Sequence, residues 1–156
     1  MFDKFEIINQ RQSNLQTKRA NPRLNQTPNE PPIPNRMPAT YSFEKLEVWK
    51  ESRTLVVMIY KYTQLFPKEE IFGLTSQVRR AAISVSSNIA EGSGRRTIKD
   101  QSRFYVMAYG SLMEVLNQLM IAVDLKFLKE EALDTELRPL INKVSLKLYN
   151  LKNRGE

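Results

Sequence analysis

The stretch RRAAISVSSNIAEGSGRR, residues 79–96, combines a helical pattern with two pairs of arginines. Apolar residues recur there at steps of three or four, the spacing of the buried side of an α-helix: Val78, Ala81 or Ala82, Val85 and Ile89. A polar stripe with small residues follows a second side: Gln77, Arg80, Ser84, Ser87, Asn88 and Glu91. Solvated faces are usually rich in Lys and Glu rather than Ser, so we predict that this stripe packs against another helix or another subunit. The alternative is an ordinary solvent-exposed helix face.

The same periodicity predicts four helices after residue 40, and no alternating strand pattern competes with it. The helices are expected at about 43–66, 74–91, 97–126 and 130–152. Ser42 is the expected N-cap of the first helix, and Pro67 ends it. Gly92 and Gly94 supply the left-handed or flexible backbone that ends the second. Four helices with short connections predict an all-α protein, folded as an up-down-up-down four-helix bundle.

The third and fourth helices carry local signals of their own. Thr97 and Asp100 have the spacing of a capping box, in which each side chain bonds the backbone N–H of the other residue. Pro139 lacks the backbone N–H that a helix interior needs, at a cost of about 3 kcal/mol. The fourth helix therefore either kinks at Pro139 or begins near Thr135.

Residues 1–40 differ in composition from the rest, because six of the eight prolines of the chain lie there among many Asn and Gln residues. Such a segment buries too little apolar surface to offset the entropy of ordering it. We therefore predict a mobile N-terminal arm over 1–40 and a bundle domain over 41–156. The sequence has no run of about 18 apolar residues and no secretory signal pattern at its start. We expect a cytoplasmic protein without membrane contact.

The composition removes most enzyme classes. The 156 residues contain no Cys and no His, so thiolates, disulfides and the commonest general base and metal ligand are missing. Glu91 and Asp100 could act as an acid–base pair, but nothing in the sequence positions a nucleophile or an oxyanion site beside them. Gly92 and Gly94 lack the Lys and Ser or Thr of a phosphate-binding loop. We therefore expect no enzyme activity, no metal and no cofactor.

The third helix is apolar almost all the way round, as YVMAYGSLMEVLNQLMIAVDL (105–125) shows. One stripe suits the core of a bundle: Phe104, Ala108, Leu112, Val115, Leu119 and Ala122. A second stripe lies on a different face, and a lone bundle covers only one of the two, so we predict a homo-oligomer. Its interface residues are expected to be Tyr105, Tyr109, Leu116 and Met120. The alternative is a central helix whose neighbours in the same chain cover both stripes.

The net charge of +7 favours an acidic partner such as nucleic acid. Cations around the joint of the second and third helices form the predicted nucleic-acid site: Arg79, Arg95, Arg96, Lys99 and Arg103. Few aromatic residues lie near them, so we expect little reading of base sequence. Arg80 and Glu91 are about three turns apart on one face and are expected to form a structural ion pair. Ser84 and Asn88 form the polar seam between them.

Three segments resemble one protein family: FEKLEVW (43–49), FGLTSQVRRAAISVSSNIAEGSGR (72–95) and FYVMAYGSLMEV (104–115). The sequence from 41 to 150 is similar to the bacterial 23S rRNA intervening-sequence proteins, a four-helix bundle family related to the accessory variability determinant of diversity-generating retroelements. The resemblance implies a basic, ring-shaped homo-oligomer, typically a pentamer, without known catalysis. For the retroelement branch it also implies binding to a reverse transcriptase and to RNA.

These observations leave two functions open. The first is a basic oligomer that binds nucleic acid, and structured RNA in particular, through the arginine-rich cluster. The alternative is a scaffold for protein interaction, which includes an accessory subunit of a retroelement reverse transcriptase. Salt distinguishes the two, because phosphate binding weakens steeply as salt rises while an apolar assembly persists.

Overall fold

The structure, a computed structural model, describes residues 40–153, which all belong to one unit, Thr40–Glu156. The predicted N-terminal arm over 1–40 lies outside the described residues except for Thr40. Helices and turns make up the described part, and no strand occurs in it. The elements are η2 (Ser42–Lys45), α2 (Glu47–Thr63), η3 (Lys68–Ile71), α3 (Leu74–Ser93), α4 (Ile98–Asp124), α5 (Glu130–Ala132), η4 (Leu133–Leu137) and α6 (Arg138–Lys152). The all-α prediction is confirmed for residues 40–153.

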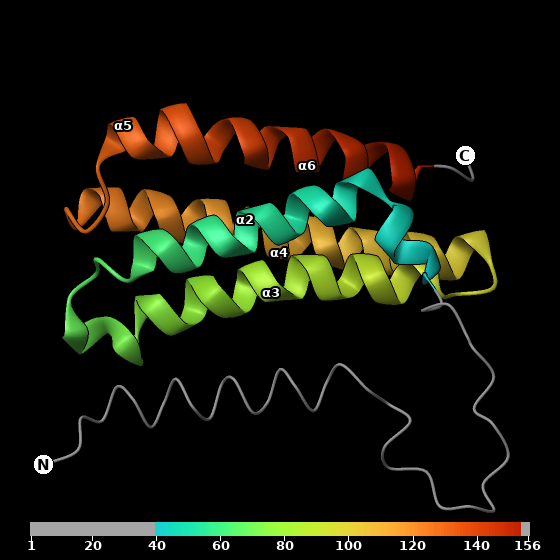
Figure 1. Cartoon of the computed structure of the whole chain (residues 1–156), viewed down its shortest axis with the longest axis horizontal. Coiled ribbons are helices and arrows are strands. Elements are labelled where there is room, and N and C mark those ends of the chain that lie inside the picture. Colours follow the sequence, from blue (N-terminus) through green and yellow to red (C-terminus); the bar gives the residue numbers. More distant parts are fainter. Residues whose placement is uncertain (1–39, 154–156) are drawn as a thin grey trace, which may run out of the picture. The chain divides into compact units, whose positions relative to one another are not determined.

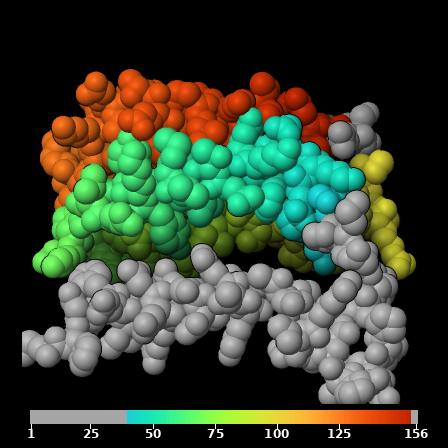
Figure 2. Space-filling model, in the orientation of Figure 1, coloured from blue at the N-terminus to red at the C-terminus, as the bar shows by residue number. Residues whose placement is uncertain are grey.

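Four long helices of the described part, α2, α3, α4 and α6, run in alternating directions along the bundle (Figure 1). α3 packs against α2 and α4, and α6 packs against the same two helices. α2 and α4 therefore lie on one diagonal of the bundle, and α3 and α6 lie on the other. Figure 2 shows α2, in cyan to green, with α6, in orange to red, beside it. This is the predicted up-down-up-down four-helix bundle.

The core of the bundle follows the predicted apolar stripes of α3 and α4. The stripe of α3 is buried: Val78, Ala81, Ala82, Val85 and Ile89. In the predicted core stripe of α4, Ala108, Leu112, Val115, Leu119 and Ala122 are buried, while Phe104 is half-buried. They share one core with residues of α2 and α6: Leu55, Ile59, Ile141, Val144 and Leu148. Each fully buried Val, Leu or Ile side chain contributes about 1.5–3 kcal/mol, so this apolar contact holds the helices together.

The first long helix is shorter than predicted. Ser42 begins a 3-10 turn, Ser42–Lys45, instead of capping an α-helix, and extended Leu46 separates this turn from α2. Phe43 in the turn packs edge-on against Trp49 in the first turns of α2, with 4.8 Å between the ring centres. This aromatic contact requires the chain to fold back ahead of α2, which a straight helix from 43 would not allow. The C-terminal end also differs, because α2 ends at Thr63.

The α3–α4 connection departs from the prediction at its glycines. α3 continues through Gly92 to Ser93, and Gly94 follows with φ −87° and ψ −6°, in the right-handed helical region. α3 does end at Gly94 as predicted, but none of the described glycines has a positive φ, so it ends without the left-handed backbone that was one of the two expected forms. Gly92 is buried, and a Cβ atom there would lie 2.9 Å from Cε1 of Tyr105 on α4. Gly92 therefore permits α3 and α4 to approach closely.

Thr97 and Pro139 affect the starts of α4 and α6 nearly as predicted. Thr97 Oγ1 accepts a hydrogen bond from the Asp100 backbone N–H at 3.2 Å and caps α4, but the return bond from Asp100 is absent among residues 40–153. Pro139 lies in the first turn of α6, the position at which a helix tolerates proline best. The π-helical segment Leu133–Leu137 precedes it, with the Arg138 N–H donating to the Leu133 carbonyl. The fourth helical region is thus irregular just before the proline.

One carboxylate joins α2 to α6. Glu51 is mostly buried, and its Oε1 atom accepts from Lys147 Nζ at 2.6 Å and from Lys143 Nζ at 2.9 Å. Burial by itself raises the pKa of this carboxyl, but the hydrogen bonds from Lys147 and Lys143 outweigh it and hold the pKa below its ordinary value. The ionised form of Glu51 therefore stabilises the contact between these two helices.

Candidate nucleic-acid interface

Arg79 joins α3 to α2. Its Nε atom donates a hydrogen bond to Thr63 Oγ1 at 2.8 Å, and its guanidinium carbon lies 4.6 Å from the centre of the Tyr60 ring. Its side chain is half-buried, while Thr63 is buried. The prediction that Arg79 is free to meet a ligand is therefore wrong. Its contacts give it the structural role that the sequence assigned to Arg80.

The predicted ion pair between Arg80 and Glu91 does not form. Eleven residues of helix span about 16 Å, far more than an ion pair can bridge, so a shared face did not imply contact. Glu91 instead pairs with Arg95, four residues on, whose guanidinium also lies 4.4 Å from the Phe104 ring centre. Arg80 is exposed and has no ion pair within residues 40–153. Arg95, expected to bind nucleic acid, is thus engaged within the chain.

The polar seam lies where small side chains let α3 approach α4. Ser84 Oγ is 2.9 Å from Ser111 Oγ on α4, and Asn88 Nδ2 donates to the Ser84 carbonyl at 2.9 Å. This part of the predicted stripe therefore packs against another helix of the same chain. The rest of the stripe is exposed: Gln77, Arg80, Ser87 and Glu91.

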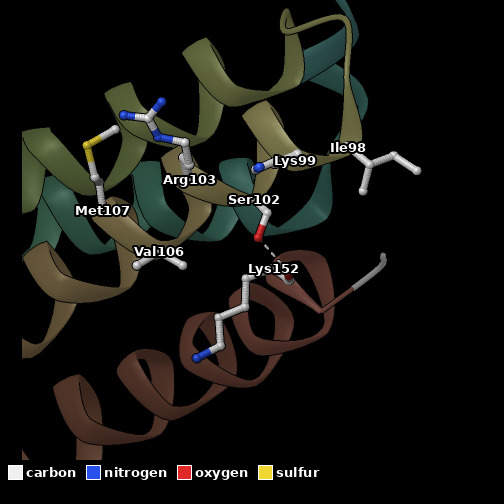
Figure 3. A pocket seen from close by; sticks show the side chains of 7 residues that line it. All are labelled: Ile98, Lys99, Ser102, Arg103, Val106, Met107 and Lys152. Carbon is white, nitrogen blue, oxygen red and sulfur yellow. Dashed lines mark hydrogen bonds between the residues drawn. The ribbon is translucent and has the colours of Figure 1, made fainter. Parts of the chain in front are cut away.

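The remaining cations of the predicted site cluster at the start of α4. Arg96, Lys99 and Arg103 are exposed, and none of them pairs with a carboxylate in the described part of the chain. Lys99 and Arg103 line an open hollow of about 800 Å³ between the start of α4 and the end of α6. The hollow is lined by Ile98, Lys99, Ser102, Arg103, Val106, Met107 and Lys152 (Figure 3). Its charged side chains are thus all cationic.

The predicted oligomer interface on α4 is only partly available. Tyr105 is buried in the core of its own bundle, so its assignment to an intersubunit interface is wrong. Tyr109 and Leu116 are half-buried against the same core, and Met120 is 48% exposed. Neighbouring helices of the chain therefore cover much of the second stripe. Exposed apolar residues lie elsewhere on α4 and at its C-cap as well: Ile98, Val106, Met107, Ile121 and, at the cap, Leu125.

α4 also meets the length and composition criteria for a membrane span, although the sequence analysis predicted no such segment. The helix has 27 residues, and its most apolar window has a mean hydropathy of 1.4. In the bundle, 33% of that window is buried. One such helix is weak evidence of a membrane span, because the criteria use length and composition only and core helices of soluble proteins also meet them. No group of three or more acidic residues within 40–153 is arranged to hold a metal ion.

The relationship of the chain to known proteins rests on one family match. The sequence model of one protein family, the 23S rRNA-intervening sequence proteins, matches residues 44–150. The chain belongs to this family. The matched range covers all four long helices almost completely and includes every predicted site residue. None of the curated proteins matches the chain. The family membership is thus confirmed, while the relation to retroelement accessory proteins stays a prediction.

Lys152 is the cation of this family member that the sequence prediction missed. It lies just beyond the matched range, on the last turn of α6. Its Nζ is 4.7 Å from the ring centre of Tyr109 and 5.0 Å from that of Tyr149, and Ser102 Oγ on α4 donates to its carbonyl at 2.6 Å. In Figure 3, Arg103 and Met107 extend to one side of α4 and Lys152 lies on the other. The place of Lys152 could have been predicted from the antiparallel arrangement of the bundle, because α6 ends beside the start of α4.

Proposed function

We propose that this protein is a non-enzymatic, cytoplasmic member of its family that binds structured RNA. The binding site is the α4 basic surface, defined as Arg96, Lys99, Arg103 and Lys152. The observation that carries the proposal is that these four cations gather at one end of the bundle without a carboxylate partner among residues 40–153. Family membership in the 23S rRNA-intervening sequence proteins supports a role connected with nucleic acid.

The electrostatics of this surface suit a phosphate backbone. Each cation that neutralises a phosphate releases a condensed counterion, and this supplies most of the sequence-independent affinity. The backbone N–H groups at the start of α4 add a favourable dipole at the same place. Arg79 and Arg95 are left out of the surface, because the guanidinium of each already donates a hydrogen bond to a side chain of the bundle, Arg79 to Thr63 and Arg95 to Glu91. Lys152 is kept, because its ammonium group lies over two aromatic rings and pairs with no carboxylate among residues 40–153.

Self-association is part of the proposal. Met120 and Ile121 near the end of α4, with Leu125 at its C-cap, leave an exposed apolar strip. A second copy that covered this strip would remove its area from water. The family resemblance suggests a ring of five copies. A ring repeats the α4 basic surface, so that one RNA can contact several copies at once and bind more tightly than a single bundle would.

A protein scaffold is the second candidate, including an accessory subunit of a reverse transcriptase. The connection between α2 and α3, at the opposite end of the bundle from the α4 basic surface, exposes Leu65, Ile71 and Phe72. Phe72 is 90% exposed. Exposed apolar residues of this size are a common feature of protein-binding surfaces, so this observation favours a protein partner.

The experiment measures the affinity of the full chain for an RNA hairpin as a function of salt. Arg96→Glu with Lys99→Glu should weaken binding and lower the slope of log affinity against log salt by about two, one for each phosphate that is no longer neutralised. The matched control is Lys68→Glu with Lys129→Glu, which changes the net charge equally at exposed positions away from the hollow. This control should retain most of the affinity and the slope.

Two results would contradict the proposal. An equal loss of affinity in both double variants would mean that only the net charge attracts RNA, with no defined surface. A wild-type protein that does not bind the hairpin at low salt, while it retains its oligomeric mass, would favour the scaffold.

A further inference from the structure

The hollow between α4 and α6 combines charge with an apolar floor. Lys99, Arg103 and Lys152 line it together with Ile98, Val106 and Met107. These apolar side chains are 46–56% exposed, so they face the open space. The volume of about 800 Å³ falls within the range of pockets that hold small organic molecules or single nucleotides.

A continuous RNA duplex does not use this floor. The outside of a duplex presents phosphates and sugars, which pair with cations but leave the exposed faces of Val106 and Met107 in water. An unpaired nucleotide presents a phosphate and, next to it, a flat base whose faces prefer contact with apolar side chains to contact with water. Its chemistry therefore matches both halves of the hollow.

Lys152 is held in place before any ligand arrives. The rings of Tyr109 and Tyr149 both lie about 5 Å from its ammonium group. The hydrogen bond from Ser102 Oγ to the Lys152 carbonyl, at 2.6 Å, fixes the end of α6 against the first turns of α4. In Figure 3 Val106 lies between Lys152 on one side and Arg103 on the other. The hollow thus has cations on two sides of its apolar floor.

We infer that the hollow takes one unpaired nucleotide of the bound RNA. Its base lies against Val106 and Met107, and the flanking phosphates contact Lys99, Arg103 and Lys152. The inference rests on the proposed RNA-binding function and narrows its ligand to RNA with a bulged or looped-out nucleotide. Aliphatic contacts discriminate little between bases, so the hollow selects for an unpaired nucleotide rather than for a base sequence.

The test compares two short RNA duplexes that differ only by a single bulged nucleotide, at one salt concentration. The full chain should bind the bulged duplex about fivefold more tightly, the low end of what stacking of one base on an aromatic side chain contributes, because the floor of the hollow is not aromatic. Val106→Ser with Met107→Ser should abolish this preference without changing the affinity for the paired duplex, because no charge is altered. The matched control is Val57→Ser with Leu146→Ser, at residues 68% and 64% exposed and outside the hollow, which should keep the preference.

A bulged 4-thiouridine in the same duplex should crosslink on illumination to the α4 peptide that contains Val106 and Met107. Equal binding of both duplexes by the wild type would overturn the inference and leave the proposed RNA binding intact. Absence of binding to either duplex would contradict the proposed function itself. A Val106→Ser, Met107→Ser variant that keeps the bulge preference would also overturn the inference. So would one that instead lowers the oligomeric mass, since the hollow would then be a contact between copies.

Discussion

Arg79 and Arg80 are neighbours in the sequence with opposite surroundings, so alanine at each position gives a sharp comparison. Arg79→Ala removes a charged hydrogen bond of 2.8 Å to Thr63 and a guanidinium contact of 4.6 Å with Tyr60. At a half-buried site the hydrogen bond is worth about 1.5 kcal/mol and the ring contact about 0.5–1 kcal/mol. We expect the free energy of unfolding to fall by about 2 kcal/mol and the melting temperature by about 8 °C.

Arg80→Ala is the control, because Arg80 is exposed and has no ion pair among residues 40–153. It should change the free energy of unfolding by less than about 0.5 kcal/mol. Urea and thermal unfolding measure the stability of both variants. All samples are kept at one protein concentration, because an oligomer gains stability by mass action. A double-mutant cycle of Arg79→Ala with Thr63→Val should return a coupling of about 1 kcal/mol or more. The reasoning is refuted if Arg80→Ala destabilises the protein as much as Arg79→Ala does.

Two further predictions concern a close helix contact and a carboxylate. Gly92→Ala should destabilise the protein by about 1–3 kcal/mol, because the new Cβ would lie 2.9 Å from Tyr105. Gly110→Ala, with open space around it, should instead stabilise α4 by up to about 1 kcal/mol. Thermal melting measures both variants, and equal shifts of the two melting temperatures would contradict the prediction. The lowered pKa of Glu51 means that its ionised form adds stability above the ordinary carboxyl value of 4.5, and that this is lost as pH falls through the lower folded value. Glu51→Gln should lower the free energy of unfolding by about 1–2 kcal/mol at neutral pH. The difference in unfolding free energy between variant and wild type should shrink below pH 4.5, as urea unfolding at several pH values would show. A difference that stays constant with pH would contradict this prediction.

The places of the four long helices, and the buried stripes of α3 and α4, could be read from the sequence. The reason is that hydrophobic periodicity is local: Val85 and Ile89 lie one turn apart on any α-helix, whatever surrounds it. Thr97 as the cap of α4 is local in the same sense, because its partner Asp100 is only three residues away. The three family segments also lie within single helices or their joints, and the range of the family match, 44–150, contains them except for Phe43.

The roles of individual residues in the candidate site depended on neighbours that sequence spacing does not reveal. Periodicity places Arg79 on one side of α3, but only the packing of α2 decides that Thr63 lies beside it. From the sequence, Gly92 was expected to end a helix, but in the structure it is the point where Tyr105 packs against α3. Lys152 reaches the hollow from 49 residues beyond Arg103 because α6 runs antiparallel to α4 and ends where α4 begins. The sequence by itself therefore determined the core stripes of α3 and α4, while the rotation and direction of the neighbouring helices determined which other faces are covered and which cations remain free to bind.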